Sequence, residues 1–203
     1  MLVTDTNLTN TPVLSLQAGG AVAYTDTPII DPDALKIIGF NLTGPLVKHA
    51  EANILDARSV REYSRMGMVV DSADDFVSAD DVIKIQKVLA LRFNLIGLKV
   101  ETKKGTKLGK VSGFTATDND FMIQQIIVQR PALKALLDPE LVISRKEIVE
   151  INDYKIIVKD EEKKIRERAE KEDFVPNFVN PFRKNPEPDY APAQTQNPDE
   201  QDN

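Results

Sequence analysis

The sequence ILDARSVREY at residues 54–63 has a pattern that returns 88 residues later as VISRKEIVEI at residues 142–151. In both stretches two apolar residues precede a polar run, and an apolar residue, Glu and another apolar or aromatic residue follow. The match continues without a gap from MVVD at residues 68–71 to IIVK at residues 156–159. Identities are few, but the shared spacing of apolar residues predicts an internal repeat.

A second block matches at a spacing of 86 residues. Its matched pairs are Gly19 and Gly105, Val22 and Leu108, Leu35 and Phe121, Ile37 and Ile123, Phe40 and Ile126, and Leu42 and Val128. The difference between the two spacings must lie in the connection after Leu42 or after Val128. Loops absorb such insertions because their closure entropy grows only logarithmically with length. Duplication of one module explains both blocks, and chance agreement of apolar spacing is the alternative.

Each repeat is expected to be built from short strands. Residues 98–102 alternate apolar and polar side chains, and a turn follows at Gly105. The glycines of the returning strand at residues 108–114 indicate a bulge or a sharp bend. Further strands are expected at residues 121–129, 141–143 and 154–158, with a short helix at residues 130–139 that plugs one end of the fold. Several short strands joined by tight turns indicate a small β-barrel, because closure removes exposed edges.

The predicted fold class is mainly β, with two small barrels in tandem, a short helix between them and a C-terminal tail. The expected boundaries are a disordered N-terminus at residues 1–11, a first barrel at 12–75, a helical connector at 76–92, a second barrel at 93–160, and a charged helix with a disordered tail at 161–203. The tail is assigned from its proline, asparagine, glutamine and acidic content, which leaves little to bury.

The connector carries a helix signal. Ser78 with two following acids suits a helix N-terminus. One helical face gathers four apolar residues, which either pack on a barrel or bind a partner: Val82, Ile85, Val88 and Leu89.

A possible partner-binding motif lies in the tail. Phe174, Phe178 and Phe182 are spaced four residues apart, beside prolines and asparagines. Aromatic residues in a segment with little reason to fold suggest a short linear motif for a partner's groove. The alternative is that the segment folds back on its own barrel.

The second repeat also carries a family signature. The residues concerned are LIGLKV at 95–100, KGTKLGKV at 104–111, ISRKEIVEI at 143–151 and IIV at 156–158. In this pattern the chain resembles the PRC-barrel family, small β-barrels found in the H subunit of the photosynthetic reaction centre and in a ribosome maturation factor. The first repeat departs from the pattern, with Ala23 where the second has Gly109, and is assigned through the internal match. The resemblance implies a protein-binding or tethering adaptor, since the family has no shared catalytic residues, and it names no ligand.

Composition points away from catalysis. The chain has no cysteine and a single histidine, His49, so thiolate and two-histidine metal sites are excluded within one chain. Nucleophile-elbow and phosphate-loop patterns are missing. Acidic clusters at residues 71–75, 80–81 and 118–120 lack the spacing of a calcium-binding loop. We expect no enzyme activity, metal or cofactor, and no small-molecule substrate.

Charge and hydropathy bear on partners and location. The net charge of −6 disfavours nucleic acid, although five lysines fall within residues 99–110. That possible basic patch, Lys103, Lys104, Lys107 and Lys110, is either a solvated turn or an RNA contact. The leading hypothesis is therefore a non-catalytic adaptor whose partner is another protein. The alternative is an accessory factor in ribosome assembly or RNA processing that binds a ribosomal protein or RNA. Without a signal peptide or a long apolar run, the expected location is cytoplasmic, with no membrane span.

Overall fold

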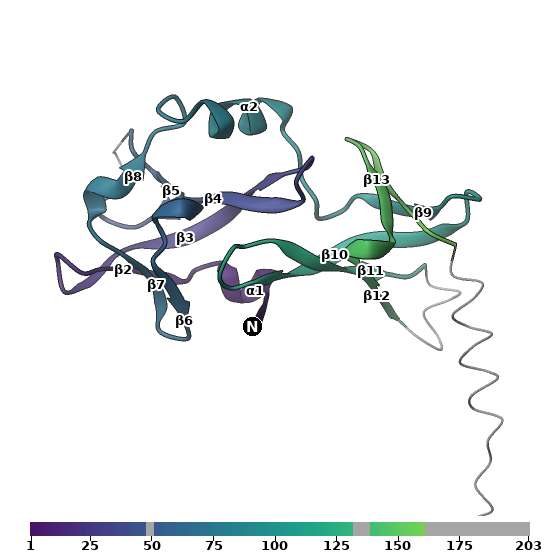
Figure 1. Cartoon of the computed structure of the whole chain (residues 1–203), viewed down its shortest axis with the longest axis horizontal. Helices are drawn as coiled ribbons and strands as arrows, with labels where there is room; N and C mark the ends of the chain where they lie inside the picture. The colour runs from purple at the N-terminus through teal and green to yellow at the C-terminus, as the bar shows by residue number, and fades with distance from the viewer. Residues whose placement is uncertain (48–50, 132–138, 161–203) are drawn as a thin grey trace, which may run out of the picture. The chain divides into compact units, whose positions relative to one another are not determined.

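The computed structural model describes residues 1–47, 51–131 and 139–160, and over these ranges the chain is mainly β, as predicted (Figure 1). Its strands form two sheets. The first has the order β6-β7-β2-β3-β4-β5-β8. Its strands are β2 (Pro12–Ser15), β3 (Gly20–Asp31), β4 (Lys36–Thr43), β5 (Ile54–Asp56), β6 (Glu62–Ser64), β7 (Gly67–Val70) and β8 (Phe76–Val77).

The second sheet has the order β12-β11-β10-β9-β14-β13, and β1 pairs with β10 beside this path. Its strands are β1 (Leu2–Thr4), β9 (Lys99–Thr102), β10 (Lys107–Thr117), β11 (Ile123–Gln129), β12 (Glu140–Ser144), β13 (Ile148–Ile151) and β14 (Lys155–Val158). Strands therefore occur in the regions of residues 98–102, 108–114, 121–129, 141–143 and 154–158, as the sequence predicts. Two strands of this sheet, β1 and β13, were not predicted.

The two sheets share one strand order and one register. Six strands of the first sheet, from β6 to β5, follow the same sequence of neighbours as the six from β13 to β12. Phe40 lies opposite Leu55 in the first sheet, and Ile126 lies opposite Ile143 in the second. These pairs are related by the spacings of 86 and 88 residues found in the sequence. The 3₁₀ turns η1 (Ala57–Ser59) and η3 (Arg145–Glu147) also occupy matching places.

Hydrogen-bonded closure, which the barrel prediction requires, is not observed among the described residues. The first ladder ends at β6 and β8, and the second ends at β12 and β13. The turn η1 joins β5 to β6, and η3 joins β12 to β13, but the two strands that each turn joins do not pair with each other. Among the described residues, the strands at the two ends of each ladder are therefore unpaired on their outer side.

A bulge recurs in the first hairpin of both sheets. Val22 is the extra residue between the Val13–Ala23 and Leu14–Ala21 pairs, and Leu108 is the extra residue before Gly109. A Cβ on Gly109 would lie 2.0 Å from the carbonyl oxygen of Gln129, and its φ of 151° also favours glycine. The bulge predicted from the glycines is confirmed, and Ala23 preserves it in the first sheet.

The prediction of a disordered N-terminus at residues 1–11 is wrong. β1 pairs antiparallel with β10, and α1 (Asp5–Leu8) follows directly. Val3 and Leu8 are buried, and the Thr25 hydroxyl donates to the carbonyl of Leu8. The segment was predicted to be disordered because most of its residues are polar, but the burial of Val3 and Leu8 holds it in place.

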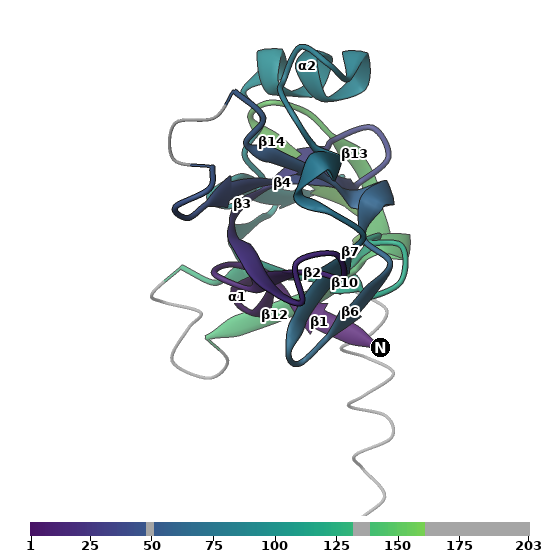
Figure 2. The same cartoon turned by 90° about the vertical axis from the view of Figure 1, so that its left-hand side faces the viewer.

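The connector forms α2 (Ile83–Leu91), which begins later than its predicted cap. Ser78 instead forms a turn in which Asp81 accepts from its backbone amide. The predicted apolar face of α2 packs on the first sheet, where Ile85 and Val88 bury Ile29 of β3 and Ile54 of β5. Figures 1 and 2 both show α2 lying over β3 and β4.

Contacts between two hairpin ends join the sheets. Lys36 forms an antiparallel bridge with Met122, its equivalent in the repeat. The amide of Ile37 donates to the carbonyl of Phe121 at 3.0 Å, and the amide of Ile123 donates to the carbonyl of Leu35 at 3.1 Å. We call these two facing ends, residues 35–37 and 121–123, the hairpin seam. Since each bond has its counterpart, the seam has the reciprocal pattern of a two-fold interface.

The core is continuous across the seam. One cluster of buried apolar residues includes members of both sheets, and within it the rings of Phe40 and Phe121 meet edge to face at 5.3 Å. Leu35 and Phe121, equivalent in the repeat, both have a positive φ and are both buried. Residues 132–138, the greater part of the helix predicted at residues 130–139, and the tail from residue 161 lie outside the described residues.

Candidate interaction surfaces

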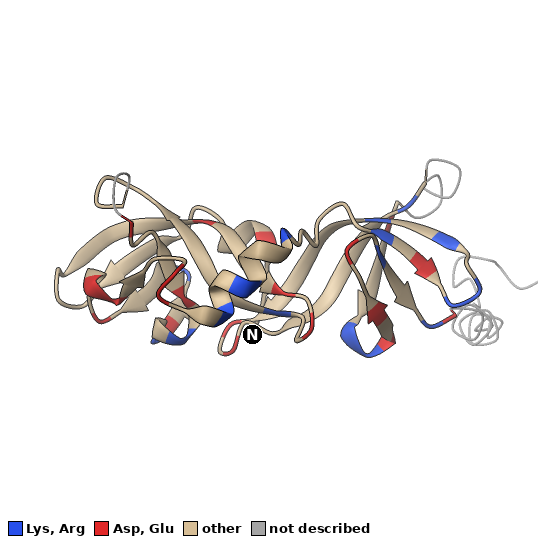
Figure 3. Ribbon diagram, turned by 90° about the horizontal axis from the view of Figure 1, so that it is seen from above, with Lys and Arg blue, Asp and Glu red and all other residues tan. Residues whose placement is uncertain are grey.

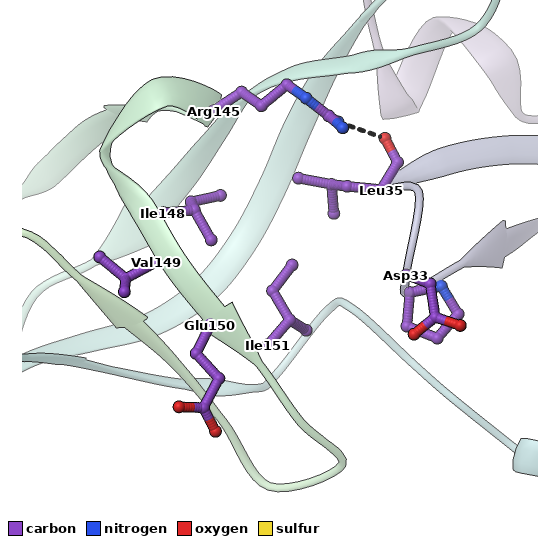
Figure 4. Close-up of a pocket in the computed structure, with 8 residues that line it drawn as sticks. Asp33, Leu35, Arg145, Ile148, Val149, Glu150 and Ile151 are labelled. Atoms are coloured by element: carbon purple, nitrogen blue, oxygen red, sulfur yellow. Dashed lines mark hydrogen bonds between the residues drawn. The ribbon is translucent and has the colours of Figure 1, made fainter.

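A groove of about 370 Å³ lies between the turn that joins β3 to β4 and the segment from η3 to β13. One wall carries Pro32, Asp33 and Leu35 (Figure 4). The opposite wall is formed by Arg145, Ile148, Val149, Glu150 and Ile151. Because its walls come from both sheets, the groove exists only through the hairpin seam.

Arg145 holds the two walls together. Its guanidinium donates to the carbonyls of Leu35 at 2.8 Å, Ala34 at 2.7 Å and Ile123 at 3.2 Å (Figure 4). A planar guanidinium with several donors suits such convergent carbonyls. Its donors point at the backbone, so Arg145 positions the groove rather than offering a free cation to a ligand.

The groove has a mixed lining, with apolar side chains on its walls and acidic side chains at its rim. Ile148 and Ile151 are half-buried and Leu35 is buried, whereas Asp33 and Glu150 are exposed. β13 ends its sheet, and among the described residues no strand pairs with its outer edge. An unpaired edge beside a groove that contains apolar side chains can accept an extended peptide.

An ion pair at the end of β3 fixes the turn beside the groove. The Lys84 ammonium lies 2.7 Å from Asp31 Oδ2, and the Asp31 carboxylate also accepts from the amides of Asp33 and Ala34. Burial raises the pKa of Asp31, but the hydrogen bond from Lys84 and those from the backbone outweigh it and lower the pKa below its ordinary value. Asp31 therefore stays ionised and ties α2 to the turn.

The predicted basic patch lies on the hairpin between β9 and β10. All four lysines lie on this one hairpin, and all four are exposed: Lys103, Lys104, Lys107 and Lys110. The amide of Lys104 donates to Asp160 at 3.4 Å, which brings a carboxylate to the same end. Figure 3 shows Lys and Arg interspersed with Asp and Glu along the ribbon, with no uniformly basic face in this view.

Large apolar side chains are exposed on the second sheet. Val142 of β12 is 54 % exposed, Val149 of β13 is 45 % exposed, and Tyr154 is 81 % exposed at the turn between β13 and β14. The first two lie on the two edge strands of the sheet. Exposed apolar groups on unpaired edges favour contact with other polypeptide segments.

Other sequence predictions have separate outcomes. Phe174, Phe178, Phe182 and His49 lie outside the described residues. Within the described ranges, no three His, Cys, Asp or Glu side chains gather as metal ligands. In the same ranges no helix is long and apolar enough to span a membrane.

The groove was missed at the sequence level, although one signal for it exists. The spacing of 88 residues places Arg145 where the first repeat has Ala57. A long cation in place of a methyl group, within an otherwise matching pattern, marks a contact that one repeat makes and the other does not.

Comparison with known proteins adds no assignment: no family model matches this sequence, and no curated protein matches it either.

Proposed function

We propose that this chain is a non-catalytic adaptor built from two PRC-barrel-like modules, and that it binds another protein at the groove beside β13. Its main support is the shared strand order of the two sheets, with matching registers at the spacings of the sequence repeat. The PRC-barrel resemblance of the second repeat supplies the expectation of a tethering role. We place the modules at residues 12–75 and 93–160, with the protein in the cytoplasm.

The partner segment proposed for the groove is an extended peptide with apolar side chains and a basic residue. Its backbone pairs with the outer edge of β13, and alternate side chains enter between Leu35 and Ile148. The rim carboxylates of Asp33 and Glu150 attract the basic residue.

The test isolates partners from native extract with the immobilised full chain and with two variants. Val149→Asp places a charge on the exposed edge of β13, whereas Met66→Asp places one on a more exposed turn of the first sheet. Both variants should retain the unfolding midpoint of the wild type. We expect one protein to be retained by the wild type and by Met66→Asp, and lost with Val149→Asp. Equal retention, or equal loss, by the two variants contradicts the proposal.

The second candidate is an RNA-linked role through the four exposed lysines of the β9–β10 hairpin. Replacing Lys103, Lys104 and Lys107 by Gln would remove three charges from an exposed hairpin. Salt-sensitive RNA binding that this variant abolishes would support the RNA-linked role, because affinity from phosphate contacts falls steeply with salt. Binding that the substitutions leave unchanged would reject it.

A further inference from the structure

The two sheets treat one equivalent edge differently. In the first sheet, β8 pairs antiparallel with the outer side of β5, with Val77 opposite Ile54 and Phe76 opposite Leu55. Phe76 is buried in the common core. β12 is the equivalent of β5, and it pairs with β11 on one side. On its other side no described residue forms a strand with it.

Burial differs at this edge as well. Ile54 is 2 % exposed, whereas its equivalent, Val142, is 54 % exposed. Leu55 and its equivalent Ile143 are both buried. The outward apolar side chain of β12 therefore lacks the cover that α2 and β8 together give to β5, and a strand's row of unpaired backbone groups lies beside it.

The sequence contains a second copy of the covering strand. β8 lies in the sequence DDFV at residues 74–77, and EDFV occurs at residues 172–175. Both place two acids before Phe-Val, so Asp75, Phe76 and Val77 correspond to Asp173, Phe174 and Val175. The two Phe-Val pairs are 98 residues apart, whereas β5 and β12 are 88 residues apart. An insertion of ten residues in the charged stretch after residue 160 accounts for the difference.

We propose that residues 172–175 of this chain dock as an antiparallel strand on the outer edge of β12, as β8 does on β5. By the register of β8, Phe174 lies opposite Ile143 and Val175 lies opposite Val142. Directly opposite residues of an antiparallel pair share a face of the sheet, so Val175 covers the exposed Val142. This assignment is independent of the groove at β13, because it concerns the opposite edge of the sheet.

The connection is long enough. Five residues separate β7 from β8, and fifteen separate β14 from Phe174. An extended chain advances roughly 3.3 Å per residue, so the longer connection reaches wherever the shorter one does. Phe178-Val179 is a competing match, but Pro176 and Asn177 precede it in place of the two acids.

Disulfide trapping in the full chain tests this register, and the absence of native cysteine leaves only the introduced pair to react. Opposite Cα atoms of antiparallel strands lie roughly 4.5–5.5 Å apart, which a disulfide can bridge. The test pair is Val142→Cys with Val175→Cys. The pair Ile54→Cys with Val77→Cys is the positive control, and Val142→Cys with Val179→Cys is the register control.

At low protein concentration we expect the test pair to close within the monomer at least about tenfold faster than the register control, because docking raises the local thiol concentration. Adding Phe174→Asp should reduce the rate to that of the control. Equal rates for the two pairs, or faster closure with Val179, would overturn the proposal. Disulfides formed only between chains would also overturn it, and would indicate strand exchange between two copies.

Discussion

The two sheets have the same connectivity, but their edges and outer faces differ. In the first, α2 and β8 bury Ile54, and in the second the equivalent Val142 is exposed. In the second sheet, β1 pairs with one end of β10. The equivalent end of β3, in the first sheet, is covered by α2 instead. The shared pattern therefore repeats the internal strand pairing but not its surroundings, because the covering segments lie outside the repeated pattern. Functional differences between two copies are then expected at edges and seams rather than in the strands.

The largest test of this contrast compares Ile54→Ala with Val142→Ala. Ile54 is enclosed by α2 and β3, so its truncation leaves a cavity and should lower the free energy of unfolding by about 2–5 kcal/mol. Val142→Ala removes a largely exposed side chain and should change it by less than about 1 kcal/mol. Urea denaturation measures both. A large loss at Val142 would show that β12 is covered as fully as β5.

The next effect concerns the seam. Arg145→Met removes a guanidinium that donates to three carbonyls and should lower the free energy of unfolding by about 2 kcal/mol. Lys146→Met removes the same charge from the adjacent exposed position and should change stability by less than about 0.5 kcal/mol. Thermal unfolding of the two variants distinguishes a bridge between the sheets from a general effect of charge. Equal destabilisation would contradict the bridge.

Acid sensitivity should be greater in the first sheet. Asp31 and Asp56 are buried there, and the repeat places Thr117 and Ser144 at their positions in the second. Burial raises the pKa of Asp56, but the Arg58 side chain and amide outweigh burial and lower it, as Lys84 does for Asp31. A folded pKa below the ordinary 3.8 adds stability that is present above that pH and is lost as the pH falls below it.

Asp31→Asn should therefore lower the free energy of unfolding by about 1–2 kcal/mol at pH 7, since it removes a charged hydrogen bond to Lys84. The difference from the wild type should shrink at pH 3, below the ordinary pKa of 3.8, because the unfolded chain then binds a proton at Asp31 that the native carboxylate, with its lowered pKa, binds less readily. Urea titrations at the two pH values measure it. A difference that stays constant with pH would mean that packing, and not charge, holds α2 at this position.

The smallest effect concerns one backbone position shared by the two sheets. Asn10 and Gly97 have φ values of 56° and 91°, and the amide of each donates to the neighbouring long strand, at Thr25 and Val111. No atom lies within 4 Å of a Cβ added to Gly97, so Gly97→Ala is disfavoured by conformation alone, by about 1 kcal/mol. Asn10→Ala should cost a similar amount, and Asn10→Gly close to nothing. If the two alanine variants lose different amounts of unfolding free energy, the backbone at Asn10 and Gly97 is not equivalent in the two repeats.

Much of the strand pattern could be predicted because it depends on local alternation. Residues 98–102 and 108–114 alternate or carry glycine where a bulge forms, and both regions became strands. β13 was missed because Ile148–Ile151 contains two exposed residues and lacks a clear period of two. The order of residues 1–11 was missed because Val3 and Leu8 are the only buried apolar residues there, which is too sparse a pattern to distinguish from a loop.

The candidate sites were less predictable. The lysines of the β9–β10 hairpin could be found from sequence because they are near neighbours in the chain. The groove could not, since its walls at Leu35 and Ile148 are more than a hundred residues apart and meet only at the hairpin seam.

Residue patterns were enough to predict that the chain is mainly β, that one apolar pattern occurs twice, and where most strands of the second copy lie. Apolar spacing determines which side chains share a face of a strand, and that information is local. Three features became visible only in the folded chain: the open ladders of the described residues, the pairing of β1 with the second sheet, and the bridge that Arg145 makes between two hairpins. Those features depend on which strand ends meet and which edges find partners, and free energies of contact between distant segments decide both.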